Sequence, residues 1–157
     1  MTMQLTFEQL GLDEALTTKS RLNNFISSVQ AYADMSPDQS IRRDVNNWMI
    51  RRDRASLTAA QWCECFGHAD SPVLAFIYKT FSEYSGLDFS RVRPSDSLNS
   101  HLHFPLVCWF DWTITFCEDF FQAFNIDLSD RFDETDFTTV GELTDFLVAQ
   151  VAAASHR

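Results

Sequence analysis

The stretch from Phe104 to Phe124 reads FPLVCWFDWTITFCEDFFQAF and is the densest apolar and aromatic segment of the chain. Thirteen of its twenty-one residues are strongly apolar. Its polar residues recur at spacings of four, three and four, which places them on one narrow stripe of a helix: Asp111, Thr115, Glu118 and Gln122. A helix that is apolar around most of its circumference must be enclosed by its neighbours or must present an aromatic face to a partner. The segment therefore predicts the central helix of the fold.

Start and stop signals for helices flank this segment on both sides. Two residue pairs have the spacing of a capping box, in which side chains satisfy the first free amides of a helix: Thr58 with Gln61, and Thr139 with Glu142. Only four Gly and four Pro interrupt the apolar residues, which recur mainly at helical spacing. The sequence therefore predicts an all-α helical bundle, with helices expected over residues 18–35, 40–55, 58–67, 72–86, 104–124 and 139–151.

Length and hydropathy indicate whether the chain can form a hydrophobic core and whether it can span a membrane. The chain has 157 residues, of which 45% are apolar, and this is enough for a real hydrophobic core. Because Asp111, Glu118 and Asp119 interrupt the most apolar segment, no run of about 18 apolar residues occurs and no membrane span is expected. The first residues lack a basic stretch that leads into an apolar one, so no secretory signal is predicted and a cytoplasmic location is expected.

The negative charge is concentrated in the C-terminal part of the chain. Residues 1–95 carry a net charge of -1 and residues 96–157 a net charge of -9, out of -10 in total. Such a field repels nucleic acid and attracts partners with a basic surface. Residues 40–55 are the exception, because five arginines against two aspartates give them a net charge of +3. These arginines either bind an anionic partner such as nucleic acid, or solvate their helix and bridge to the acidic half. The overall acidity disfavours nucleic acid.

Two cysteines and a histidine form a pattern that suggests a metal site. Cys63, Cys65 and His68 read C-x-C-x2-H. Structural zinc sites use four ligands, usually with C-x2-C spacing, and only His101 and His103 remain to complete the set. No metal is therefore expected, and Cys63 is interpreted as a core residue. Without an export signal, the four cysteines of the chain are expected to be reduced, buried side chains.

The order of elements over residues 72–152 resembles one known superfamily. A helix and a long loop containing SDSL lead to the central segment, which closes on FNIDLSD at residues 124–130; the last helix opens with TTVGEL at residues 138–143. This order is similar to that of the acyl carrier proteins, which pair F-G-I-E-I-P-D with a final T-V-G-D-L helix. The resemblance implies a carrier-like domain of three or four helices over residues 71–157, with residues 1–70 as a helical extension packed on it. It also suggests a bacterial protein.

The carrier family attaches phosphopantetheine to a serine at the start of its central helix, within Asp-Ser-Leu. Counting back from Phe124 by the family's spacing reaches Phe110, and aligning the end of the loop reaches Leu106, so neither alignment finds this serine. The phrase Asp96-Ser97-Leu98 does occur, but it lies in the linker before the central segment. Ser97 is kept as an alternative pantetheine site, and the main interpretation has no cofactor.

No nucleophile elbow, glycine-rich phosphate loop or zinc-protease motif occurs in the sequence, and no catalytic residue is predicted. The preferred hypothesis is a non-catalytic, cytoplasmic protein-binding module with a carrier-like fold that has lost its prosthetic group. Its partner would be a protein with a basic surface, which it would inhibit or neutralise as an immunity-type protein does. Because interface energy comes from buried aromatics and association rate from complementary charge, the predicted partner-binding residues are Trp109, Phe110, Asp111, Trp112, Glu118 and Asp119.

The sequence leaves two alternative functions and one structural question open. The chain is alternatively an acyl carrier in acyl transfer or lipid metabolism, modified at an atypical serine or acting as a carrier mimic. It is alternatively a nucleic-acid binder through the arginines of residues 40–55. The turn from Trp109 to Trp112 is either core or interface. If the helices over residues 18–67 cover it, Phe110 or Trp112 should pack on Trp48 or Trp62, whereas a bare turn favours a partner interface.

Overall fold

Helices make up the regular structure of residues 37–156, the part of the chain that the computed structural model describes. These residues contain no strand, and one isolated bridge pairs Ser97 with Thr139. The fold of this part is an all-α helical bundle, which confirms the predicted fold class. The helix expected over residues 18–35 lies outside the described residues. The helices are α2 (Gln39–Arg51), α3 (Ala59–Cys65), α4 (Pro72–Ser85), α5 (Phe104–Val107), α6 (Trp112–Phe124) and α7 (Val140–Ser155), with short 3-10 helices η1 (Phe89–Arg91) and η2 (Glu134–Asp136).

Both capping boxes that the sequence predicts are formed. At the start of α3 the hydroxyl of Thr58 accepts a hydrogen bond from the amide of Gln61 at 3.2 Å, and the Gln61 side chain accepts one from the Thr58 amide at 2.9 Å. Thr139 and Glu142 make the same two bonds at the start of α7, each at 3.2 Å. These pairs satisfy amides that have no partner inside their helix.

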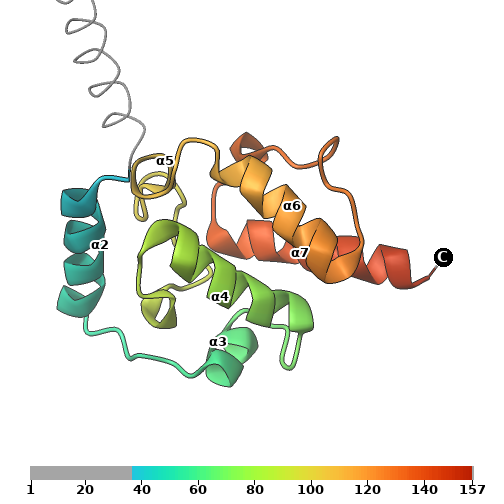
Figure 1. The fold of residues 1–157 in the computed structure, drawn as a ribbon. Coiled ribbons are helices and arrows are strands. Elements are labelled where there is room, and N and C mark those ends of the chain that lie inside the picture. The colour runs from blue at the N-terminus through green and yellow to red at the C-terminus, as the bar shows by residue number, and fades with distance from the viewer. Residues whose placement is uncertain (1–36, 157) are drawn as a thin grey trace, which may run out of the picture. The chain divides into compact units, whose positions relative to one another are not determined.

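Helix α4 lies at the centre of the described residues and contacts α3, α5, α7 and η1. In Figure 1 it runs between α3 and the pair α6 and α7. It starts at the predicted Ser71-Pro72 signal, where the Ser71 hydroxyl accepts a bond from the amide of Leu74 at 3.4 Å. It ends at Gly86, which takes the left-handed conformation that glycine adopts at least cost.

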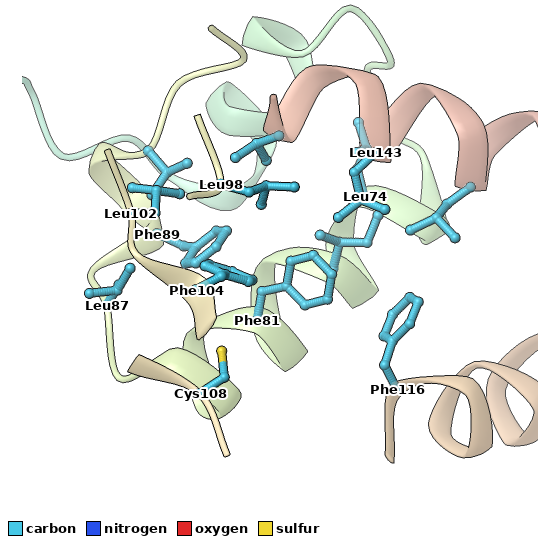
Figure 2. Close-up of a cluster of buried hydrophobic side chains, with 14 of the residues drawn as sticks. Leu74, Phe81, Leu87, Phe89, Leu98, Leu102, Phe104, Cys108, Phe116 and Leu143 are labelled. Atoms are coloured by element: carbon cyan, nitrogen blue, oxygen red, sulfur yellow. The ribbon is translucent and has the colours of Figure 1, made fainter. Parts of the chain in front are cut away.

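The core is built from aromatic side chains of α4, α5 and α6. Phe81 of α4 is fully buried, and its ring centroid lies 5.6 Å from that of Phe104 and 5.2 Å from that of Phe116. Figure 2 shows the Phe81 ring between these two rings. Separations of this size are typical of offset and edge-to-face aromatic pairs. Phe81 therefore joins three helices in one cluster.

The segment from Phe104 to Phe124 is two helices, and the expectation of a single helix is wrong. The chain leaves the helical conformation at Cys108, where φ is -97° and ψ is 163°. The last carbonyls of α5 are taken by donors from the start of α2. The Asp38 amide donates to Leu106 at 2.9 Å, and the Arg42 side chain donates to Val107 at 2.8 Å. These bonds replace those that a continuing helix would supply.

Helices α2 and α3 belong to the residues that the sequence analysis placed in an N-terminal extension. In the structure α2 contacts α5, and α3 contacts α4. Residues 37–157 cluster as one unit by their internal contacts. An ion pair adds to these contacts, because the Arg54 guanidinium binds Asp96 through two bonds of 2.6 and 2.7 Å.

Candidate protein-binding surface

The break between α5 and α6 turns two aromatic side chains outward. Phe110 is 67% exposed and Trp109 is 40% exposed. Both precede Asp111, the N-terminal flanking residue of α6, whose side chain makes no capping bond. Single exposed apolar side chains are normal on a protein surface, whereas neighbouring large ones mark binding surfaces more often.

Trp112 points the other way and is a core residue, although the sequence analysis predicted that it binds a partner. It is 7% exposed, and its ring contacts come from α4, α5, α6 and the loop after α6. These contacts are with Phe81, Phe104, Phe116 and Phe132, at centroid distances of 5.8, 5.5, 6.5 and 6.2 Å. A side chain enclosed by four rings cannot reach a partner directly. Trp112 instead holds the start of α6 in place.

Trp48 and Trp62 pack on other rings in the described residues, so the expected packing of Phe110 or Trp112 on one of them is wrong. Trp62 is fully buried, packs on Phe66 at 4.1 Å and donates its indole N–H to the Val92 carbonyl at 3.1 Å. Trp48 stacks on His101 at 5.3 Å. Among the described residues, α2 and α3 therefore leave Phe110 largely open to solvent.

A second apolar stripe runs along the outer side of α6. Ile114 is 63% exposed and Phe121 is 49% exposed, while the half-buried Cys117 lies between them. Ile114, Cys117 and Phe121 recur at spacings of three and four, which keeps them on one side of α6, while Phe110 lies in the turn before this helix. The inner side of α6 carries the buried residues Trp112, Phe116 and Phe120. Helix α6 thus has two apolar stripes, one in the core and one outside.

A groove of about 510 Å³ lies beside this outer stripe. Ile114, Cys117 and Phe121 of α6 line one side, and Phe132 lines it from the loop that follows the helix. The ring of Phe132 packs on Phe116 at 5.2 Å, so this wall is fixed to the core. A smaller hollow of about 190 Å³ borders Trp109 and Phe110 on the other side of the turn. Trp109 and Phe110 therefore line the smaller hollow, and the outer stripe of α6 lines the larger groove.

The three predicted acidic binding residues differ in how available they are. Glu118 is exposed and lines the groove, and Asp111 is half-buried at the turn. Asp119 accepts a short hydrogen bond from the hydroxyl of Tyr84 on α4. Burial, with this hydrogen bond to Asp119, raises the pKa of Tyr84 well above its ordinary value. Asp119 therefore anchors α6 to α4, and Glu118 is the residue that can meet a partner.

Two carboxylates in the loop after α6 are held in the charged form. The hydroxyl and the amide of Ser129 both donate to Asp127, and these bonds lower the pKa of the Asp127 carboxyl. Thr135 lowers the pKa of Asp133 in the same way. Asp127 lines the groove together with Glu118, so two carboxylates border it.

Ser97, the alternative pantetheine site, lies in a turn that ties the linker to α7. Its hydroxyl accepts a bond from the Ser100 amide at 2.9 Å, and its backbone pairs with Thr139. The flanking residues are both buried, Asp96 in the ion pair with Arg54 and Leu98 in the core. The Asp-Ser-Leu phrase therefore has a structural explanation in this chain, six residues before α5 begins.

The pattern that suggested zinc does not bring its side chains together. Cys63 is buried, Cys65 is exposed, and His68 binds Asp145 at 2.8 Å. Within residues 37–156 no three side chains of His, Cys, Asp or Glu are close enough to share a metal ion. All four cysteines are free thiols, as expected, but Cys65 is exposed and Cys117 is half-buried, so only Cys63 and Cys108 match the predicted burial.

The arginines of residues 40–55 divide into structural and exposed residues. Arg42 donates to the carbonyls of Val107 and Tyr84, and Arg54 is bound to Asp96. Arg43, Arg51 and Arg52 are exposed. Arg52 also lies over the ring of Trp48, at 5.3 Å from its centroid, in a cation–π contact. The predicted bridge between these arginines and the acidic half is thus present at Asp96.

Sequence reasoning missed the groove and its apolar residues. The spacing of three and four between Ile114, Cys117 and Phe121 is visible in the sequence, and it signals a second helix face. The position of Phe132 was not readable, because the loop that carries it has no periodic pattern.

Comparisons with models of known families, with curated proteins and with solved structures returned no match for this chain. No helix within residues 37–156 is long and apolar enough to cross a membrane.

Proposed function

We propose that the protein is a non-catalytic, acidic protein-binding module of the cytoplasm. Its binding surface is the turn at Trp109 and Phe110 together with the outer stripe of α6. Its partner is a protein with a basic surface, which it inhibits or neutralises in the manner of an immunity-type protein. In this proposal the fold is a carrier fold that has lost its prosthetic group, and Phe110 stands where the modified serine would be.

The observation that carries the proposal is the exposure of Phe110 beside an apolar stripe in an acidic region. Phe110 is 67% exposed in the turn before α6, and Ile114 and Phe121 are exposed on the helix that follows. Residues 111–136 contain eight acidic residues and one arginine. An apolar centre with a charged surround is the arrangement in which a few residues supply most of the binding energy and the charges guide association. A basic partner therefore gains from both parts of this surface.

Affinity capture from the protein's own cells tests the proposal. The full chain is immobilised as wild type, as Phe110→Ala and as Thr115→Ala, a control that changes an exposed residue of α6 outside both hollows. We expect one basic protein at stoichiometric yield on the wild type and the control, about tenfold less on Phe110→Ala, and release by added salt. Equal yields on Phe110→Ala and wild type, or no stoichiometric partner at all, would contradict the proposal.

A further inference from the structure

We infer that the groove beside α6 receives an amphipathic basic helix of the partner. Its apolar side chains lie on Ile114, Phe121 and Phe132, and its Lys and Arg side chains meet the carboxylates at the edges. The inference rests on the proposed function, because it specifies which part of a basic partner binds and where.

The apolar lining of the groove is continuous and held by the core. Ile114 and Phe121 are seven residues apart on α6, so they lie on the same side of the helix two turns apart. Phe132 faces them from the loop after α6, and its ring also packs on Trp112 at 6.2 Å. The α6 residues along the groove run from 113 to 122, a length of about 14 Å at about 1.5 Å per residue. This length accommodates between two and three turns of a partner helix.

The shape of the surface favours a helix over an extended peptide. Ile114, Cys117 and Phe121 recur at spacings of three and four along α6, and this is the pattern by which one helix packs along another. An extended peptide binds best by adding a strand to the edge of a sheet, and residues 37–156 contain no sheet. The groove is also open, since Ile114, Glu118 and Phe121 are exposed along it.

The charged side chains that line the groove favour an occupant of positive charge. Glu118 lines the groove on α6 and Asp127 lines it on the loop. The nearest basic side chain in the sequence, Arg131, is exposed and donates to Gln150 at 2.8 Å, and its charge also helps to lower the pKa of the Asp127 carboxyl, so Glu118 and Asp127 together outweigh one positive charge. A fatty acid or another anionic amphiphile would bring its own negative charge towards these carboxylates, whereas Lys and Arg beside an apolar stripe complement them. The groove therefore fits a cationic amphipathic segment.

A synthetic peptide tests the inference on the full-length protein. The probe is a fluorescent helix of about 14 residues made of Leu and Lys in amphipathic order. The comparison peptide has the same composition in scrambled order. Fluorescence anisotropy at low salt should show saturable binding of the amphipathic peptide, about tenfold tighter than that of the scrambled one. The double change of Ile114→Ala and Phe121→Ala should weaken binding by about tenfold, while Thr115→Ala leaves it unchanged.

Cys117 provides a readout inside the groove. In a Cys65→Ser background it is the remaining thiol that is not buried. The rate at which a maleimide labels Cys117 should fall at least about fivefold when the amphipathic peptide is bound, because the helix covers the thiol. An unchanged labelling rate at saturating peptide, equal binding of the scrambled peptide, or unchanged affinity of the double variant would each overturn the inference.

Capture of the natural partner separates this inference from the proposed function. If the partner is lost on Phe110→Ala but retained on the double variant of Ile114 and Phe121, the turn alone binds the partner, so the groove inference is wrong and the proposed function stands without the stripe of α6. If Phe110→Ala retains the partner, the proposed function itself is wrong. Loss on both variants, together with protection of Cys117 by the partner, supports both.

Discussion

Arg54 and Asp96 show how a charged pair can be structural in an acidic protein. The Asp96 side chain is buried, and besides its two bonds to Arg54 it accepts the amide of Arg93 at 2.8 Å. The guanidinium in turn donates to the carbonyl of Arg91 at 3.1 Å. A buried charge that loses its partner keeps its desolvation cost and gains nothing in return. The pair is therefore a sensitive point of the fold.

Replacing Asp96 tests this view. Asp96→Ala should lower the free energy of unfolding by about 3–5 kcal/mol, because it leaves Arg54 unpaired in a largely buried position. Asp145→Ala is the matched control, since it removes the exposed partner of His68 and should cost no more than about 1 kcal/mol. Urea unfolding of both variants measures the difference. Similar losses in the two variants would show that the buried pair has no special role.

The cysteine thiols should differ in reactivity in the order of their burial. Cys65 is exposed, whereas burial raises the pKa of Cys108 to about 12 and also raises the pKa of Cys63. The thiolate is the form that reacts with a disulfide reagent. At about pH 8, Cys65 should therefore react promptly and Cys117 more slowly, while Cys63 and Cys108 should react only after unfolding. Thiol titration with and without denaturant measures this. Prompt reaction of Cys108 in the folded protein would contradict the structure.

At the scale of elements, the helix starts and stops could be read from the sequence because their signals are local. Each of these signals involves residues at most three positions apart. All three are formed: the capping boxes at Thr58 and Thr139, and the start at Ser71-Pro72. The break between α5 and α6 could not be read, because no glycine or proline marks Cys108. The bond from Arg42 to Val107 joins residues 65 positions apart. Only the tertiary structure brings them together.

Arg42 is therefore expected to matter for the arrangement of helices. Arg42→Met removes the charged donor for the carbonyls of Val107 and Tyr84, and it should lower the free energy of unfolding by about 1.5–3 kcal/mol. Arg43→Met, on the exposed side of the same helix, is the control and should change stability by less than about 0.5 kcal/mol. Thermal or urea unfolding gives both values. Equal effects of the two substitutions would show that Arg42 does not hold the end of α5.

At the scale of the whole chain, composition indicates a region of the sequence and not which of its residues are exposed. The acidity of residues 96–157 and the aromatic segment pointed to one region, and Phe110 is exposed there. Composition could not tell which aromatic residue faces outward, because Phe110 and Trp112 are only two positions apart in the sequence. Burial against Phe81 and Phe104 decides it for Trp112. The groove depends on Phe132, whose position is set by packing.

Site-specific photocrosslinking in the protein's own cells tests the binding surface most directly. A photoreactive phenylalanine analogue replaces Phe110 in one variant and Ala60, an exposed residue of α3, in the other. We expect a crosslink from position 110 to one basic protein, absent at position 60 and lost when Ile114 and Phe121 are both changed to alanine. The same crosslinked protein at both positions, or none at position 110, would contradict the claim that this turn and α6 form the binding surface.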